Sequence, residues 1–194
     1  MSMYHGGSRA LQAEFGSTAL ADRLEEKLSR TRFTDDDKAF IESLGFFFLA
    51  TADDQGRPDC SFKGGHPGFV RVLAPDCLAF PDYDGNGMFR SLGNVRVNPN
   101  VGMLFIAMGA APKRLRVNGR ATHSLDDERM SLFPGAQGLI LVEPERIFPN
   151  CPRYIPNLET GETSKYVPTE GDAPVEPAWK TFEIFRDVVP PRRK

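Results

Sequence analysis

Cysteine is scarce in this chain, and its placement excludes two kinds of stabilised fold. The three cysteines, Cys60, Cys77 and Cys151, lie far apart and form no CxxC pair. Such spacing argues against both a disulfide framework and a structural zinc site. The three histidines are isolated and do not form an HExxH pattern, so the sequence predicts no catalytic zinc site either.

Long apolar runs and an excess of charge of one sign are also missing. No window approaches the roughly 18 to 20 apolar residues that cross a bilayer, and the N-terminal residues lack the apolar run of a signal peptide. Lysine and arginine number 24 against 26 acidic residues, which gives a net charge of −2. This balance provides no overall attraction to nucleic acid or to an anionic membrane. We expect a soluble cytoplasmic protein that binds neither, and any anion site must be local.

The sequence also lacks the short motifs of several enzyme classes. It contains no GxSxG nucleophile turn, no P-loop and no glycine-rich Rossmann fingerprint. The segment DGNG at 84–87 resembles part of a calcium loop but lacks the closing glutamate. No side chain is therefore identified as a catalytic acid, base or nucleophile, and no metal is expected. The lack of such a side chain suits a protein whose bound cofactor performs the chemistry itself.

Hydrophobic periodicity predicts a mainly β protein with flanking helices. Apolar residues recur at helical spacing in 20–28 and again after Thr34, which we expect to be the N-cap of a helix whose first turn contains three aspartates. The period then changes to that of short strands, predicted at 46–52, 57–63, 69–73, 77–81, 101–108, 115–124 and 138–148. About seven strands at this spacing indicate an antiparallel barrel or sandwich.

Three regions are predicted along the chain. Residues 1–33 form an N-terminal helical arm, and residues 34–148 form the barrel. Residues 149–194 hold eight of the sixteen prolines but also several large apolar side chains. Proline limits regular structure, whereas exposed aromatic groups disfavour a fully solvated tail. We therefore expect this last segment to dock on the barrel or on a partner subunit.

The stretch PDYDGNGMFRSLGNVRVNPN at 81–100 is the strongest candidate for a binding site. Its glycines let the backbone approach a ligand closely, and Asn86 and Ser91 can donate hydrogen bonds. Arg90 falls where a short helix begins, and exposed N–H groups at a helix start bind anions. Three more basic residues, Lys63, Arg71 and Arg116, are expected on strands of the barrel. Together they predict a cradle for a phosphate group. The alternative is a plain connection between two strands.

The order of motifs resembles the FMN-binding split-barrel family related to pyridoxamine 5′-phosphate oxidase. The resemblance rests on FFFLATADDQGRPDCSFKGG, GFVRVL, LAFPDYDGNGMFRSLGNVRVNPNVGMLFI and LRVNGRA and covers roughly residues 35 to 148. It implies a split antiparallel β-barrel and a homodimer with FMN at the interface. The cofactor-binding positions that it implies are Ser61, Phe62, Lys63, Phe80, Pro81, Asn86, Arg90 and Ser91, with Arg114 or Arg116 from a later strand.

The sequence departs from the oxidase at two places. Arg90-Ser91 stands where the oxidase carries an arginine-lysine pair, and the C-terminal arginine and histidine pattern that binds its substrate is not visible. The resemblance therefore implies an FMN-dependent oxidoreductase acting on an unidentified small substrate, and not vitamin B6 oxidation. Two alternatives stay open: a non-catalytic flavin-binding or sensing protein, and a related barrel that uses deazaflavin or haem, with His66 or His123 as an axial ligand.

Overall fold

The computed structural model describes residues 2–167 and 175–191, and the chain divides into two compact units. The larger unit comprises Arg30–Ala107 and Lys113–Asn150. The smaller unit combines the N-terminal residues up to 29, residues 108–112 and the described residues from 151 onward. The predicted division into residues 1–33, 34–148 and 149–194 stays a prediction. Part of the predicted C-terminal segment, residues 168–174 and 192–194, lies outside the described residues.

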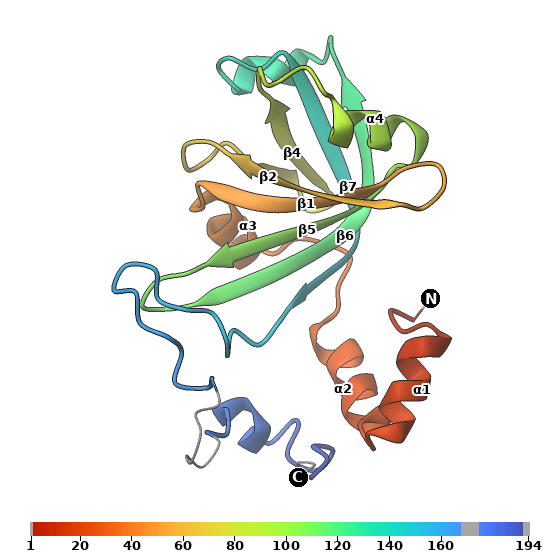
Figure 1. The fold of residues 1–194 in the computed structure, drawn as a ribbon, viewed down its shortest axis with the longest axis vertical. Coiled ribbons are helices and arrows are strands. Elements are labelled where there is room, and N and C mark those ends of the chain that lie inside the picture. Colours follow the sequence, from red (N-terminus) through yellow and green to blue (C-terminus); the bar gives the residue numbers. More distant parts are fainter. Residues whose placement is uncertain (1, 168–174, 192–194) are drawn as a thin grey trace. The chain divides into compact units, whose positions relative to one another are not determined.

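The larger unit is built on one antiparallel sheet of seven strands (Figure 1). Their order across the sheet is β2-β1-β5-β6-β7-β4-β3. The strands are β1 (Phe46–Ala52), β2 (Pro58–Gly64), β3 (Arg71–Ala74), β4 (Cys77–Asp82), β5 (Asn100–Ala107), β6 (Lys113–Ser124) and β7 (Gly138–Pro149). Strands β2 and β3 are the two edges of this order, so the barrel is split and not closed. The predicted fold class, a mainly β split antiparallel barrel with flanking helices, is confirmed.

The pairing of the two longest strands is irregular at a glycine. Strand β6 alternates buried residues such as Leu115 and Val117 with exposed ones such as Arg116. The pairing of β6 with β7 shifts register between Asn118 and Gly119. A Cβ atom at Gly119 would lie 2.2 Å from the carbonyl oxygen of Glu143, so only glycine fits at this irregularity.

Helix α3 (Asp35–Glu42) begins as the sequence predicts. The Thr34 side chain accepts a hydrogen bond from the Asp37 N–H at 3.2 Å, and the Asp37 carboxylate accepts one from the Thr34 N–H at 3.0 Å. This capping box satisfies two N–H groups at the helix start. Asp37 is buried, and its carboxylate also forms an ion pair with Arg30. The predicted N-cap is confirmed, and the same carboxylate fixes the chain that enters the barrel.

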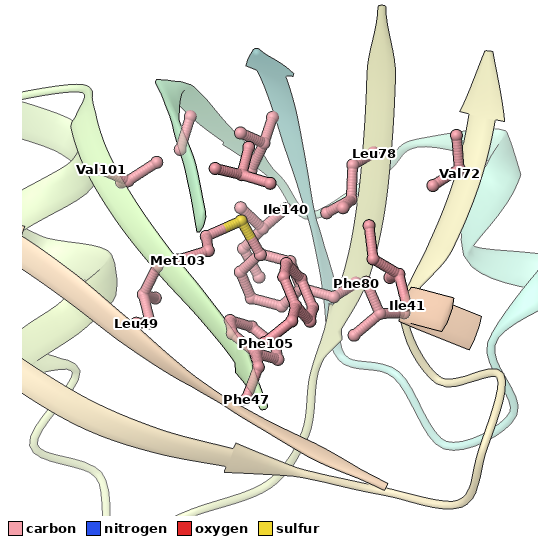
Figure 2. Close-up of a cluster of buried hydrophobic side chains, with 14 of the residues drawn as sticks. Ile41, Phe47, Leu49, Val72, Leu78, Phe80, Val101, Met103, Phe105 and Ile140 are labelled. Carbon is pink, nitrogen blue, oxygen red and sulfur yellow. The ribbon is translucent and has the colours of Figure 1, made fainter. Parts of the chain in front are cut away.

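The core of the barrel is aromatic at its centre. The Phe47 ring is fully buried and lies 5.0 Å from the Phe80 ring and 5.2 Å from the Phe105 ring, measured between centroids. Figure 2 shows these rings pointing toward one another from β1, β4 and β5, with Met103 of β5 and Ile41 of α3 beside them. Contacts of this kind join strands that are distant in the sequence.

The smaller unit contains helices α1 (Gly6–Glu14) and α2 (Thr18–Leu28) and the described C-terminal residues. The Arg23 guanidinium of α2 lies 3.2 Å from the Asp187 carboxylate and donates a hydrogen bond to the carbonyl oxygen of Ile184 at 2.7 Å. Phe185 is buried, whereas Phe182 is 52% exposed. Docking of this segment on the barrel or on a partner subunit stays a prediction. No described helix is long and apolar enough to cross a membrane.

Removal of the central ring tests this account of the core. Phe47→Ala deletes a fully buried side chain and leaves a cavity, so we expect the free energy of unfolding to fall by about 3–5 kcal/mol. Leu125→Ala is the control, because Leu125 is 61% exposed and its loss is expected to change stability by about 0.5 kcal/mol or less. Urea unfolding measures both. Equal effects of the two substitutions would contradict the assignment of Phe47 to the core.

Candidate functional site

Helix α4 (Arg90–Val97) follows the loop after β4 and packs on β1, β2 and β6. Leu92 and Val95 supply its buried face. The Asn94 amide donates a hydrogen bond at 2.9 Å to the hydroxyl of Thr51, which is buried on β1. The helix is therefore held to the sheet by apolar burial and by a part-buried hydrogen bond.

The N-terminus of α4 leaves its first N–H groups without a side-chain cap. The preceding residue, Phe89, adopts the left-handed conformation with φ 48° and ψ 28°, and no side chain caps the helix there. Among the described residues with a side chain beyond hydrogen, Phe89 alone has positive φ. The Met88 N–H bonds to the Asn86 side chain at 3.1 Å, which tightens the loop just before this point. Uncapped N–H groups and the helix dipole favour an anion at this position.

A cleft of about 310 Å³ opens in front of this helix start. It lies within the larger unit and is bounded by β2, the end of β4, the loop before α4, the first turn of α4 and the residue before β7. The lining residues are Asp59, Cys60, Ser61, Lys63, Asp82, Tyr83, Gly85, Asn86, Gly87, Met88, Phe89, Arg90, Ser91, Leu92 and Gln137.

The period-two alternation of β2 explains why Asp59, Ser61 and Lys63 turn toward the cleft. Asp59, Ser61 and Lys63 are the less exposed residues of this strand. They pair with Thr51, Leu49 and Phe47 of β1, whose side chains are buried. Paired residues in an antiparallel sheet share a face. The cleft is therefore a polar continuation of the core face at the β2 edge, where the split barrel opens.

The two basic side chains that line the cleft differ in their exposure to solvent and in their ion pairing. Lys63 forms no ion pair within 4 Å with any described residue, and burial lowers the pKa of its ammonium, while Asp82 and Asp59 oppose that shift. The Arg90 side chain is 62% exposed, and its Nε lies 3.4 Å from the Asp59 carboxylate. Lys63 is thus a partly desolvated cation without a close counter-ion in the described chain.

Two carboxylates balance these cations. Asp59 belongs to β2, and Asp82 ends β4. The Gln137 side-chain amide donates to the Asp82 carboxylate at 3.1 Å and to the Tyr83 carbonyl oxygen at 3.3 Å. In formal charge, Asp59 and Asp82 cancel Lys63 and Arg90. The cleft therefore attracts an anion through local donors and not through a net positive charge.

The structure brings five of the residues predicted from the sequence into this one cleft: Ser61, Lys63, Asn86, Arg90 and Ser91. The uncapped N-terminus of α4 stands among them. Their proximity is what the phosphate-cradle hypothesis requires.

Three other predicted residues lie on the opposite face of the sheet. Phe62 is 62% exposed and pairs with Phe48 of β1. In the same register, Phe48 pairs with Leu104 of β5, and Leu104 pairs with Arg116 of β6. Phe62 and Arg116 therefore lie on the same face of the sheet. Arg114 lies two residues from Arg116 on the same strand and therefore shares its face. None of the three lines the cleft.

The remaining predicted residues are also outside the cleft. Phe80 is 1% exposed and belongs to the core cluster, and Pro81 is buried beside it on β4. Arg71 of β3 lies with its guanidinium carbon 5.4 Å from the centre of the Phe133 ring and donates a hydrogen bond to the carbonyl oxygen of Gly68. Arg71 thus contacts an aromatic side chain and a turn instead of the loop before α4.

The sequence analysis did not identify the carboxylates of the cleft, Asp59 and Asp82, or Gln137, which donates a hydrogen bond to Asp82. Asp59 could have been found, because it precedes Ser61 and Lys63 at a spacing of two in a predicted strand. Gln137 gives no local signal. It reaches the cleft because the residue after it, Gly138, pairs with Asp82 across β4 and β7.

The two histidines considered for haem differ in exposure. His66 is exposed in the loop after β2. Both ring nitrogens of His123 are buried without a hydrogen-bond partner in the described chain, and a Cβ atom at Gly138 would lie 2.5 Å from its Nε2. The His123 nitrogens are enclosed by protein atoms in this arrangement and do not face the cleft. The described residues also contain no cluster of three or more histidine, cysteine, aspartate or glutamate residues suited to a metal ion.

Residues 33–147 match the model of the family described as "Pyridoxamine 5′-phosphate oxidase". These residues include strands β1 to β6 and most of β7. The chain belongs to this family. The matched segment contains every residue that lines the cleft. No curated protein sequence showed significant similarity to the chain.

The chain is also similar to solved structures, two of which are described as binding different cofactors. HupZ of Group A Streptococcus is 17% identical, with 68% of this chain and 98% of that chain covered and a TM-score of 0.48. The heme storage protein HutZ of Vibrio cholerae is 20% identical, with coverages of 61% and 95% and a TM-score of 0.44. An FMN-binding protein of Syntrophomonas wolfei is 11% identical, with coverages of 75% and 98% and a TM-score of 0.46. At these identities and scores we assign no ligand from the similarity.

Replacing the desolvated lysine tests the electrostatics of the cleft. We expect Lys63→Met to raise the melting temperature of the ligand-free protein at pH 7, because the wild-type protein holds a partly buried charge there. The cost is fully present below the lowered folded-state pKa and disappears as pH rises toward the ordinary value of 10.5, so the advantage of the variant should shrink with pH.

The matched control is Arg120→Met, which removes one positive charge from an exposed position on β6. It should leave the melting temperature nearly unchanged across the same pH range. A lower melting temperature for Lys63→Met at pH 7 would show that the ammonium stabilises the ligand-free fold, contrary to this account.

Proposed function

We propose that the protein is an FMN-dependent oxidoreductase that binds the FMN phosphate in the cleft at the start of α4 and acts on a small substrate. The observation that carries the proposal is the convergence of Lys63 and Arg90 with the uncapped N-terminus of α4. Family membership supports the same reading, because residues 33–147 match the pyridoxamine 5′-phosphate oxidase family.

The residues present fit a phosphate monoester. Lys63 supplies a cation without a close counter-ion in the described chain, and Arg90 supplies a guanidinium on the first residue of α4. The Ser61 and Ser91 hydroxyls line the same cleft and can donate to phosphate oxygens. Charge-assisted hydrogen bonds of this kind are about twice as strong as neutral ones. Ser91 is buried in the first turn of α4, so its position is fixed before a ligand arrives.

The protein's own residues then act by binding and orientation. Lys63 and Arg90 hold the phosphate, while Asn94 and Thr51 keep the helix start in place behind it. When bound, FMN supplies the electron-transfer chemistry, which no side chain of the cleft needs to provide. Met88 and Phe89 are 65% and 59% exposed at the mouth of the cleft, where they offer apolar surface to the rest of such a ligand. We assign no catalytic side chain.

We also propose a homodimer that forms through the outer face of the sheet. One register row crosses five strands through Phe62, Phe48, Leu104, Arg116 and Phe148. The Phe62 ring lies 6.1 Å from the Phe48 ring and remains 62% exposed. Aromatic residues and arginine are enriched at protein interfaces, so this row suits a second copy of the chain. Phe62 stands between the cleft residues Ser61 and Lys63 on β2, so such an interface would adjoin the cleft.

Flavin titration of the apoprotein tests the phosphate site. We expect Arg90→Ala or Lys63→Ala to weaken FMN binding by roughly ten- to a hundredfold, because each removes a charge-assisted contact of about 1.5–3 kcal/mol. Riboflavin lacks the phosphate, so its affinity should change little. Flavin fluorescence at fixed salt measures both ligands. Equal weakening of FMN and riboflavin would favour a plain strand-to-strand connection at 81–100.

Light scattering during size-exclusion chromatography tests the dimer. We expect the wild-type protein to elute with twice the chain mass of 21.5 kDa. Phe62→Asp places a charge at the most exposed aromatic side chain of the register row, on the edge strand β2, and should shift the protein to monomer. Leu125→Asp, at another exposed apolar residue, should leave the dimer intact. A wild-type monomer that binds flavin stoichiometrically would overturn the proposal.

A further inference from the structure

We propose that Asp59 is a specificity-determining residue that competes with the ligand's phosphate for Arg90. This inference rests on the proposed phosphate site and adds a role for a residue outside the predicted donor set. Asp59 would act as an internal anion: it pairs with Arg90 in the empty cleft, and a ligand must displace it. A dianionic phosphate monoester meets that requirement better than a monoanion such as a phosphodiester or a carboxylate.

Geometry fixes Asp59 more firmly than its partner. The Asp59 side chain is 22% exposed, whereas the Arg90 side chain is 62% exposed. Asp59 pairs in register with Thr51, and Thr51 accepts the Asn94 hydrogen bond that holds α4. The Asp59 backbone is thus held in the sheet beside the helix, while the more exposed guanidinium has room to move toward another acceptor.

The distance between the Arg90 guanidinium and the Asp59 carboxylate also indicates a weak contact that a ligand can replace. The Arg90 Nε lies 3.4 Å from the Asp59 carboxylate, which is longer than a charge-assisted hydrogen bond of about 2.7–2.9 Å. Exposed ion pairs contribute little to stability. A phosphate with two charges and three acceptor oxygens offers Arg90 a stronger partner.

The second carboxylate of the cleft has a different role. Asp82 accepts a hydrogen bond from Gln137 and lies at the end of β4, and it forms no ion pair within 4 Å with Arg90. Its negative charge acts on Lys63, where it opposes the lowering of the ammonium pKa by burial. The competition for Arg90 therefore falls to Asp59, and the overall charge balance of the cleft keeps weakly charged anions from binding.

The test uses the full-length apoprotein, with FMN and riboflavin titrated separately at fixed salt. We expect Asp59→Asn to tighten FMN binding by roughly two- to tenfold, since the freed guanidinium and the loss of repulsion each contribute about the strength of an exposed ion pair. Riboflavin affinity should not change. In an Arg90→Ala background, Asp59→Asn should retain only the part of this gain that comes from the loss of repulsion. Asp54→Asn, at the β1–β2 turn outside the cleft, controls for net charge.

The outcomes separate the two claims. If Asp59→Asn weakens FMN binding, or changes FMN and riboflavin alike, Asp59 is not a competing anion and the inference is overturned even when Arg90→Ala behaves as expected. If Arg90→Ala leaves the ratio of FMN to riboflavin affinity unchanged, the phosphate site itself is wrong. Asp59→Ser is the second variant, measured in the same way, so that a folding defect of one substitution cannot decide the question. The competing-anion role further requires that inorganic phosphate inhibit FMN binding more strongly in Asp59→Asn than in the wild type.

Discussion

The hydrogen bond between Asn94 and Thr51 ties the candidate site to the barrel. Thr51 is buried on β1, and Asn94 reaches it from the middle of α4 at 2.9 Å. The same stretch of β1 pairs with β2, which sets Asp59, Ser61 and Lys63 on the core face beside the helix. The start of α4 and the polar residues of β2 therefore meet because both are fixed to one strand. A shift of one residue in the β1–β2 register would turn these three side chains to the opposite face.

Two features of the cleft lower the stability of the ligand-free protein and favour the binding of an anion. A partly buried ammonium at Lys63 and a left-handed backbone at Phe89 are both unfavourable in a ligand-free protein. Each becomes useful when an anion enters, because the charge is then paired and the helix start is already open. The balancing carboxylates limit this gain, so affinity depends on the ligand's own charge. Such local departures from the most stable arrangement are typical of functional sites.

Much of the fold can be read from the sequence because its signals are local. The short β-prone run at 46–52 and the turn after it predict the β1–β2 hairpin closely, and Thr34 with its aspartates predicts the start of α3. Helix α1 was not predicted as a separate element, because its segment Gly6–Glu14 begins with two glycines and has no buried residue. The strand order was also beyond reach, since the β4–β7 pairing joins segments about sixty residues apart.

The site was predictable only in part, for a related reason. Lys63, Arg90 and Ser91 follow from local patterns at strand and helix ends, and the structure places them in one cleft. Arg71 and Arg116 also alternate with apolar neighbours, but alternation alone does not say which face of a sheet meets the loop before α4. Their positions depend on strand order, which puts Arg71 on the edge strand β3 and Arg116 in the row with Phe62. Gln137 depends on a long-range pairing in the same way.

The central claim is that the phosphate of a bound flavin lies at the start of α4. A crystal structure of the protein crystallised with FMN tests it most directly. The account predicts phosphate density within hydrogen-bonding distance of the Lys63 ammonium and the Arg90 guanidinium, with Arg90 turned away from Asp59. Flavin density whose phosphate lies away from this cleft, with the Arg90–Asp59 contact intact, would contradict it.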